Sequence, residues 1–213
     1  MVNYPNMKKN PILTINSTSQ KHYTAHRGMS LEEDISLSNE YYLIHNRAVI
    51  YKKPTPVQIV KVDYPRRESA KIVEAYYKTP STTDYNGLYR EKYVDFEAKE
   101  TKAKTFPFGN ISQHQIDHLQ RIINHGGIAF IIIAFTSLNE VYLIDASHVI
   151  CDYYHSHRKS MTYDRIKSLG HIIPQGYQPR LDYLNVIDEV YFKEDEWWKN
   201  WNWKRDQQSL LNK

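Results

Sequence analysis

The sequence predicts an α/β domain in which helices flank a mixed β-sheet. Helical and strand-like patterns alternate along the chain, as they do in domains of this class. An unbroken apolar run at 128–135 has the length of a buried strand, and a strand-like run at 141–144 follows it as a hairpin neighbour. The 213 residues, of which 41% are hydrophobic, are enough to bury one sizeable core.

Caps and prolines mark the elements of the first half of the chain. Ser30 and Glu33 form a capping box, which begins a helix. Pro54 and Pro56 separate two strand-like runs, because proline cannot continue a central strand. Pro65 breaks the chain again. The expected elements are a helix at about 31–45, strands at 48–52 and 57–62, a short helix at about 68–77 and a strand at about 92–100.

The second half is organised around the apolar run. A stripe of Ile116, Leu119 and Ile123, closed by two glycines, predicts a helix at 112–124. Two further helices are expected at about 162–169 and 179–191. Helices on either side of short strands support the mixed sheet flanked by helices.

Charge and composition divide the chain into three parts. Residues 1–31 hold four basic side chains and no carboxylate, so we expect a flexible basic arm at 1–26, either lying along a polyanion or simply solvated. A domain at 27–192 and a tail at 193–213 with all four tryptophans complete the chain. No apolar run approaches the roughly 20 residues of a membrane span, and Cys151 is the single cysteine. These features predict a cytoplasmic protein without membrane contact.

The segment around Glu97 is the strongest chemical signal. Side chains alternate along a strand, so Asp95, Glu97 and Lys99 share one face. Asp84 lies in a turn upstream that can bring its carboxylate beside them. Mg²⁺ needs only one or two carboxylates, and a neighbouring lysine can stabilise a phosphate transition state. The alternative is an ordinary exposed strand face, which alternation alone would produce.

Six blocks spread over the chain together carry a resemblance. They include TTDYNG and DFEAKETK and lie at 27–32, 52–60, 82–87, 95–102, 114–116 and 177–184. In this order they closely resemble the RecU family of bacterial Holliday junction resolvases. The resemblance implies a restriction-endonuclease-like core with a protruding stalk. It also implies a homodimer that nicks two opposed strands of four-way junction DNA, with Mg²⁺ or Mn²⁺, in recombination and DNA repair.

The resemblance also assigns site residues. Matched motif to motif, the metal ligands are Thr82, Asp84, Glu97 and Gln115, and Lys99 stabilises the transition state. Thr83 is the alternative to its neighbour Thr82. Gln115 fits because a helix after the catalytic strand can bring an amide to the metal, whereas without the resemblance it would be a surface glutamine.

The family's stalk corresponds to about 62–80. By this resemblance Arg66 and Arg67 contact phosphates and Tyr76 and Tyr77 stack on unpaired bases at the crossover. A solvated turn for the arginines and a core stripe for the tyrosines are the alternatives. Arg27 matches a family arginine linked with DNA binding.

Two other functions remain open from sequence. One alternative is a DNA-binding, strand-annealing regulator of RecA in which cleavage is secondary, and the other is a restriction-type nuclease acting on linear duplex. The resemblance implies RecA and the RuvAB branch-migration complex as partners. His114 and His118 have a spacing that can hold zinc, but with no third ligand we interpret both as ordinary polar positions.

Overall fold

A six-stranded mixed sheet forms the body of the protein, in a computed structural model that describes residues 30–66, 69–77 and 82–192. Its central strands are parallel, and every other neighbouring pair is antiparallel. The strands, in spatial order, are β1 (Val49–Lys52), β4 (Tyr85–Tyr89), β5 (Lys92–Thr101), β7 (Ile128–Phe135), β8 (Glu140–Asp145) and β10 (His171–Ile172).

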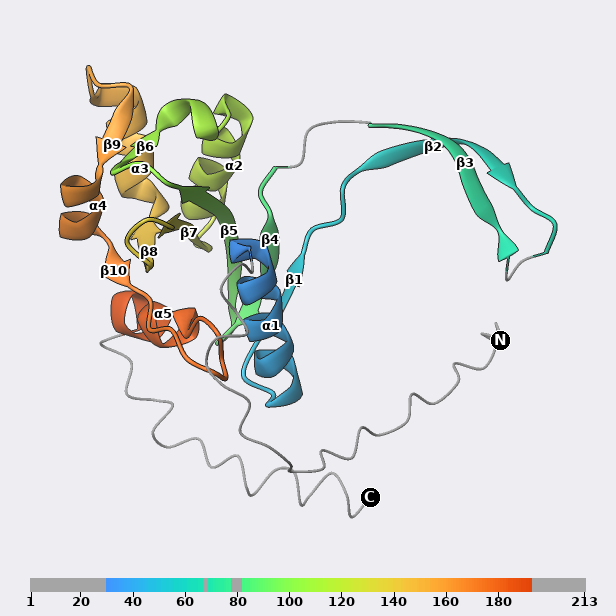
Figure 1. Cartoon of the computed structure of the whole chain (residues 1–213), viewed down its shortest axis with the longest axis horizontal. Helices are drawn as coiled ribbons and strands as arrows, with labels where there is room; N and C mark the ends of the chain where they lie inside the picture. Colours follow the sequence, from blue (N-terminus) through green and yellow to red (C-terminus); the bar gives the residue numbers. More distant parts are fainter. Residues whose placement is uncertain (1–29, 67–68, 78–81, 193–213) are drawn as a thin grey trace, which may run out of the picture.

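Helices cover both faces of this sheet (Figure 1). The buried side chains form two clusters, one with α1 (Leu31–Ile44) and α5 (Tyr183–Tyr191) and one with α2 (Gln113–Asn124), α3 (Ala146–His155) and α4 (Tyr163–Leu169). These clusters lie on the two faces of the sheet, since successive residues of β7 belong alternately to one cluster and the other. The predicted α/β class with a mixed sheet is confirmed.

The core beneath β5 is aromatic. The ring of Phe96 stacks between Tyr85 and Phe130, with ring centroids 4.9 and 4.6 Å apart, and all three side chains are fully buried. Tyr183 of α5 packs against the same ring at 5.5 Å. Because Phe96 faces α5, its neighbours in β5 face the opposite side of the sheet, where α2 lies.

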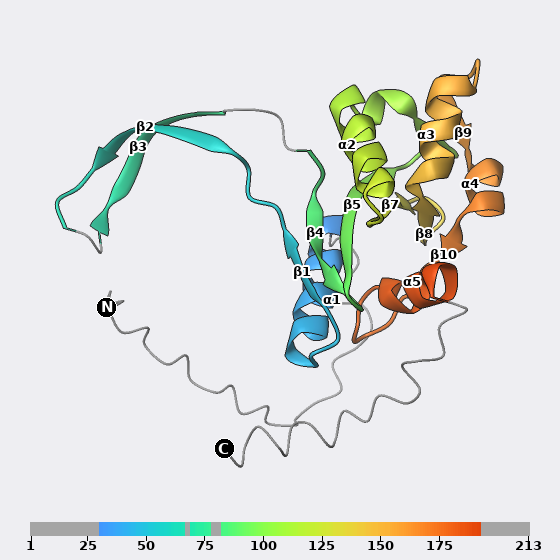
Figure 2. The ribbon, with the colours of Figure 1, turned by 180° about the vertical axis from the view of Figure 1, so that it is seen from behind.

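A long hairpin projects away from the sheet (Figure 1; Figure 2). It consists of the antiparallel strands β2 (Val57–Asp63) and β3 (Lys71–Tyr77), and every residue of both strands is exposed. We call this hairpin the arm; it is distinct from the basic N-terminal segment expected at 1–26. The helix predicted at 68–77 is wrong: Ile72, Val73 and the two tyrosines favour a strand, and pairing with β2 decides the conformation. The projecting segment also begins earlier than 62, since β2 starts at Val57.

Smaller differences concern element ends. The helix predicted at 179–191 begins only at Tyr183, because the backbone N–H of Asp182 donates to Pro174 and that of Gly176 donates to Arg180, which holds this segment as a loop. Helix α3 was not predicted. A small pair, β6 (Thr105–Pro107) with β9 (Ser160–Thr162), and a 3₁₀ turn, η2 (Phe108–Asn110), complete the structure.

The predicted segments 1–26 and 193–213 lie outside the described residues. Within the described ranges, no helix combines the length and the apolar character needed to cross a bilayer.

Candidate active site

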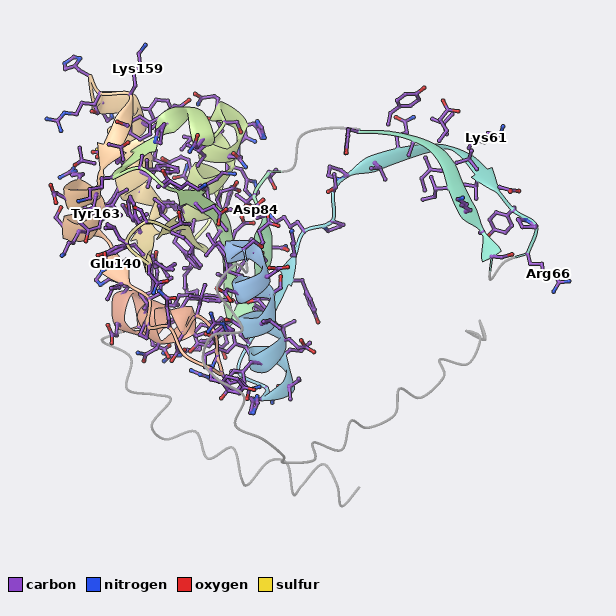
Figure 3. All side chains as sticks on the ribbon, in the orientation of Figure 1. Lys61, Arg66, Asp84, Glu140, Lys159 and Tyr163 are labelled. Carbon is purple, nitrogen blue, oxygen red and sulfur yellow. The ribbon has the colours of Figure 1, made fainter. Side chains whose placement is uncertain are left out.

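Two carboxylates meet at the centre of the sheet, on the face that α2 partly covers. The register pairs Tyr85 with Phe96, which puts Asp84, one residue before β4, opposite Glu97 in β5. The backbone N–H of Ala98 donates to Oδ2 of Asp84 at 3.1 Å and holds it against β5. Figure 3 shows Asp84 at the junction of the body and the arm. The predicted association of Asp84 with Glu97 is therefore present.

Glu97 is a buried carboxylate with one oxygen engaged. Its side chain is fully buried, and Oε1 lies 2.5 Å from Nζ of Lys99 and accepts a hydrogen bond from Nε2 of Gln115 at 2.7 Å. Its other oxygen, Oε2, is buried and accepts no hydrogen bond from any described residue. Burial raises the pKa of Glu97 to about 7, and the negative charge of Asp84 adds to the rise, which Lys99 opposes.

Gln115 reaches the site from the first turn of α2. Its amide nitrogen contacts Glu97, while its Oε1 accepts hydrogen bonds from the backbone N–H and the hydroxyl of Ser112, both at 3.0 Å. The amide oxygen thus caps the helix. To offer that oxygen to a cation, the amide would have to turn over.

The two threonines before Asp84 have different surroundings. Thr82 is exposed, and its hydroxyl accepts a hydrogen bond from Nζ of Lys53 at 3.2 Å. Thr83 is buried, and its hydroxyl donates to Asp95. Thr82 is therefore the more accessible of the pair, and its role as a metal ligand stays a prediction.

Asp95 has an environment that the sequence did not reveal. It is fully buried, and its carboxylate meets Nζ of Lys53 at 2.8 Å, the hydroxyl of Tyr93 at 3.0 Å, Nε2 of His118 at 3.1 Å and the hydroxyl of Thr83. The alternative of an exposed strand face is wrong for both Asp95 and Glu97. His118 is also more than an ordinary polar position, because it contacts a buried carboxylate. In the sequence, only the spacing of three residues between Gln115 and His118 indicated that His118 lies near the site, because it puts both side chains on one side of α2.

The site fits a hard divalent cation. Two facing carboxylates, one with a buried oxygen that lacks a hydrogen-bond donor, leave negative charge that a cation would neutralise. The described part of the chain holds no cluster of three or more acidic, histidine or cysteine side chains arranged for a metal. Mg²⁺ nevertheless needs only one or two carboxylates, since it keeps several of its waters.

Proton competition should make metal binding depend on pH. A cation held by Glu97 would require its ionised carboxylate. Because the pKa of Glu97 is raised to about 7, the affinity of the free protein for Mn²⁺ should fall about tenfold per pH unit below 7 and level off above it. Titration of Mn²⁺ between about pH 5.5 and 8.5, followed by electron paramagnetic resonance, measures this dependence. A constant affinity from about pH 5.5 to 7 would show that Glu97 is not the group in competition.

The predicted DNA contacts lie apart from the carboxylates. Arg66 is exposed at the far end of the arm, and the labelled side chain in Figure 3 points away from the body. Tyr76 and Tyr77 are 61% and 83% exposed near the root of the arm, so the core-stripe alternative is wrong. Arg27 and Arg67 lie outside the described residues.

Comparison with known proteins identifies relatives over most of the chain. The sequence profile of the family described as "RecU: Recombination protein U" matches residues 26–189. A protein named Holliday junction resolvase RecU from Geobacillus sp. (strain WCH70) is 59% identical over 170 residues, which is 78% of this chain and 85% of that protein. A protein of the same name from Bacillus cytotoxicus is 53% identical over 197 residues, covering 90% of this chain and 98% of the relative.

One solved structure has a weaker similarity. It is Hjc, a Holliday junction resolvase from Archaeoglobus fulgidus, with a TM-score of 0.40 and 11% identity over 66% of this chain and 92% of that one. A similarity this low carries no weight for fold or function. The sequence relatives and the profile do, and by both of them this chain belongs to the RecU family.

Proposed function

We propose that this protein is a metal-dependent endonuclease that resolves Holliday junctions by paired symmetric nicks during homologous recombination and DNA repair. The observation that carries the proposal is the buried carboxylate of Glu97, which faces Asp84 and contacts Lys99 at 2.5 Å. The names of the relatives support the substrate.

The chain's own residues divide the chemistry between them. Asp84 and Glu97 would hold Mg²⁺ or Mn²⁺. The hydroxyl of Thr82 and, once its amide has turned over, the oxygen of Gln115 would complete the protein ligands. Such an ion, when bound, activates water and offsets charge on the phosphate. Lys99 is 27% exposed in its side chain, so its ammonium can reach both the carboxylate and an arriving phosphate. It would stabilise the extra negative charge of the transition state.

The arm supplies a surface for branched DNA. Its two strands expose aromatic, apolar and basic side chains on both faces. Arg66 and Arg67 would contact phosphates, and the tyrosines near the root would stack on bases left unpaired at the crossover. Arg27 would add a further phosphate contact.

Removal of the two tyrosines should weaken junction recognition selectively. We expect the double variant Tyr76→Ala/Tyr77→Ala to bind a four-way junction about tenfold or more weakly and a linear duplex almost unchanged, because stacking contributes about 1–3 kcal/mol per base. Fluorescence anisotropy with both DNAs in a chelator measures the difference. Tyr177→Ala, which changes an exposed tyrosine outside the arm, serves as control. An equal loss for both DNAs would exclude stacking at the crossover.

Paired nicks require two active sites of opposite orientation. A homodimer with two-fold symmetry provides them from one chain, whereas a monomer would have to act twice. We therefore propose a homodimer, which sedimentation equilibrium of the intact protein tests. RecA and RuvAB are proposed as partners on the family resemblance, and the cytoplasm as the place of action because the bacterial chromosome lies there.

One comparison tests the central proposal. The protein is incubated with a labelled four-way junction and a matched linear duplex, with Mg²⁺ and with chelator. Symmetric nicking of the junction alone, and only with metal, supports the resolvase. Tight junction binding without cleavage under Mg²⁺ or Mn²⁺ would favour the strand-annealing regulator of RecA, and equal cleavage of both DNAs would favour a restriction-type nuclease.

A further inference from the structure

The root of the arm is tied together by one side chain. The chain leaves the sheet at Lys53, directly after β1, and returns at Thr82, shortly before β4. The backbone N–H of Lys53 donates to the carbonyl of Asp84 at 2.8 Å. Its ammonium donates to the hydroxyl of Thr82 at 3.2 Å and to that of Thr83 at 2.5 Å. Lys53 therefore belongs to the outgoing segment and is hydrogen-bonded to the returning one.

The same ammonium is anchored in the catalytic strand. Nζ of Lys53 lies 2.8 Å from Oδ2 of Asp95, which precedes Glu97 by two residues on the same face of β5. Asp95 also accepts hydrogen bonds from Thr83 and Tyr93, and His118 of α2 contacts it. We call Lys53, Asp95 and Thr83 the root clamp. It joins both ends of the arm to the strand that carries Glu97.

The orientation of Lys53 separates it from the surface lysines. Its side chain is 15% exposed and points inward, whereas the neighbouring Lys52 is 49% exposed and pairs with Glu32. A buried ion pair gains little net stability, because both charges lose hydration, so its best-attested value is in fixing one arrangement of chain segments. Here the arrangement concerns the turn that carries Asp84.

Two prolines restrict the backbone where the arm leaves the sheet. Pro54 follows Lys53 directly, and Pro56 lies two residues further along. Asp84 and Glu97 repel each other while both are ionised. The backbone N–H of Ala98 holds the carboxylate of Asp84, and Lys53 holds the turn that carries it. A displacement of the arm would therefore be transmitted through the root to Asp84.

We propose that Lys53 and Asp95 are positioning residues: the root clamp fixes Asp84 against Glu97 and couples DNA engagement by the arm to the geometry of the metal site. The inference rests on the proposed metal-dependent nuclease function. It assigns neither residue a contact with the metal or the DNA. Because coupling between two sites is reciprocal, a junction that engages the arm should raise metal affinity, and the metal should raise junction affinity.

The first test measures Mn²⁺ binding to the free protein by electron paramagnetic resonance. Lys53→Met and Asp95→Asn should each weaken Mn²⁺ binding about tenfold or more, the scale found for residues that orient metal ligands. Junction binding in chelator should stay within about twofold of wild type. Lys53→Arg, which keeps charge and donors, should restore part of the affinity. Lys92→Met, an exposed lysine at the start of β5, is the matched control.

Unchanged Mn²⁺ affinity in a folded Lys53→Met or Asp95→Asn protein would overturn the inference. So would a loss of junction binding in chelator as large as the loss of Mn²⁺ affinity, since Lys53 would then be a DNA contact. If wild type itself bound no Mn²⁺, the proposed metal-dependent function would fail instead, which keeps the two failures distinguishable.

A second measurement needs no change in the root clamp, and it decides the matter if those variants fail to fold. In a Lys99→Met background, expected to bind DNA but to cut it about 100- to 1,000-fold more slowly, Mn²⁺ affinity is compared with a four-way junction and with a linear duplex bound. Both DNAs would bring phosphates to the site, whereas the junction would engage the arm more fully than the duplex. We expect an affinity several-fold higher with the junction, and equal affinities would refute the coupling.

Discussion

Replacement of Glu97 by glutamine should lower junction cleavage at least about 1,000-fold while leaving junction binding in chelator within about threefold of wild type. The amide keeps the shape of the side chain but removes one of the two charges that would hold the cation. Loss of a cation's contribution of several kcal/mol to transition-state stabilisation corresponds to a factor of this size. Single-turnover cleavage with saturating protein measures the chemical step directly.

The same variant carries a stability readout. Ionised Glu97 is destabilising in the metal-free protein, because burial and Asp84 raise its pKa to about 7. A carboxyl with a raised folded-state pKa favours folding in its protonated form, so wild type loses this stability as pH rises from its unfolded pKa through about 7. At pH 8, Glu97→Gln should therefore unfold at a temperature no lower than wild type.

A matched control lies on the same strand. Glu100 is exposed and points to the opposite face of β5, so Glu100→Gln should cleave like wild type. If Glu97→Gln retained more than about a tenth of wild-type cleavage, the metal site would have to be sought elsewhere.

Lys99→Met should reduce cleavage by about 100- to 1,000-fold, the range found when one group that stabilises developing negative charge is removed. Junction affinity should change little, because one cation among many phosphate contacts contributes modestly to binding. Lys99 opposes the rise in the pKa of Glu97, so its loss should move the pH curve of Mn²⁺ binding to higher pH.

That shift of the pH curve distinguishes a local electrostatic effect of Lys99 on Glu97 from a general loss of folded structure. Lys167→Met, on α4, which contacts β8 two strands away from β5, should leave both cleavage and the pH curve unchanged. Full activity of Lys99→Met would remove Lys99 from the chemistry, and an unmoved pH curve would show that it does not act on Glu97.

Local pattern was sufficient to predict β5 and its polar face. Alternation along β5 put Glu97 and Lys99 on one face, and the structure has them in contact. The turn before β4 was correctly expected to bring Asp84 near them. These predictions succeed because strand periodicity and a turn are properties of a few adjacent residues.

The wrong predictions concern contacts between elements that are separated along the sequence. Alternation does not tell whether a helix covers Asp95, and burial of that carboxylate depends on α2, which follows β5 at some distance along the chain. Residues 68–77 were expected to be helical because their pairing with β2 is invisible in a local window. Gln115 entered only through the family resemblance, since a helical glutamine carries no signal of its own.

The exposure of the arm on both faces has a thermodynamic consequence. A two-stranded hairpin without a core of its own is marginal in water, so any partner that requires one arm conformation must supply the free energy of fixing it. A crossover that surrounds the hairpin can offset that entropy through many contacts. A continuous duplex offers the arm fewer contacts. Binding of the duplex is therefore disfavoured even without a steric clash between the duplex and the arm. Discrimination between the two DNAs can therefore arise because only the crossover makes enough contacts to offset the entropy of fixing the arm, without steric exclusion and without reading a base.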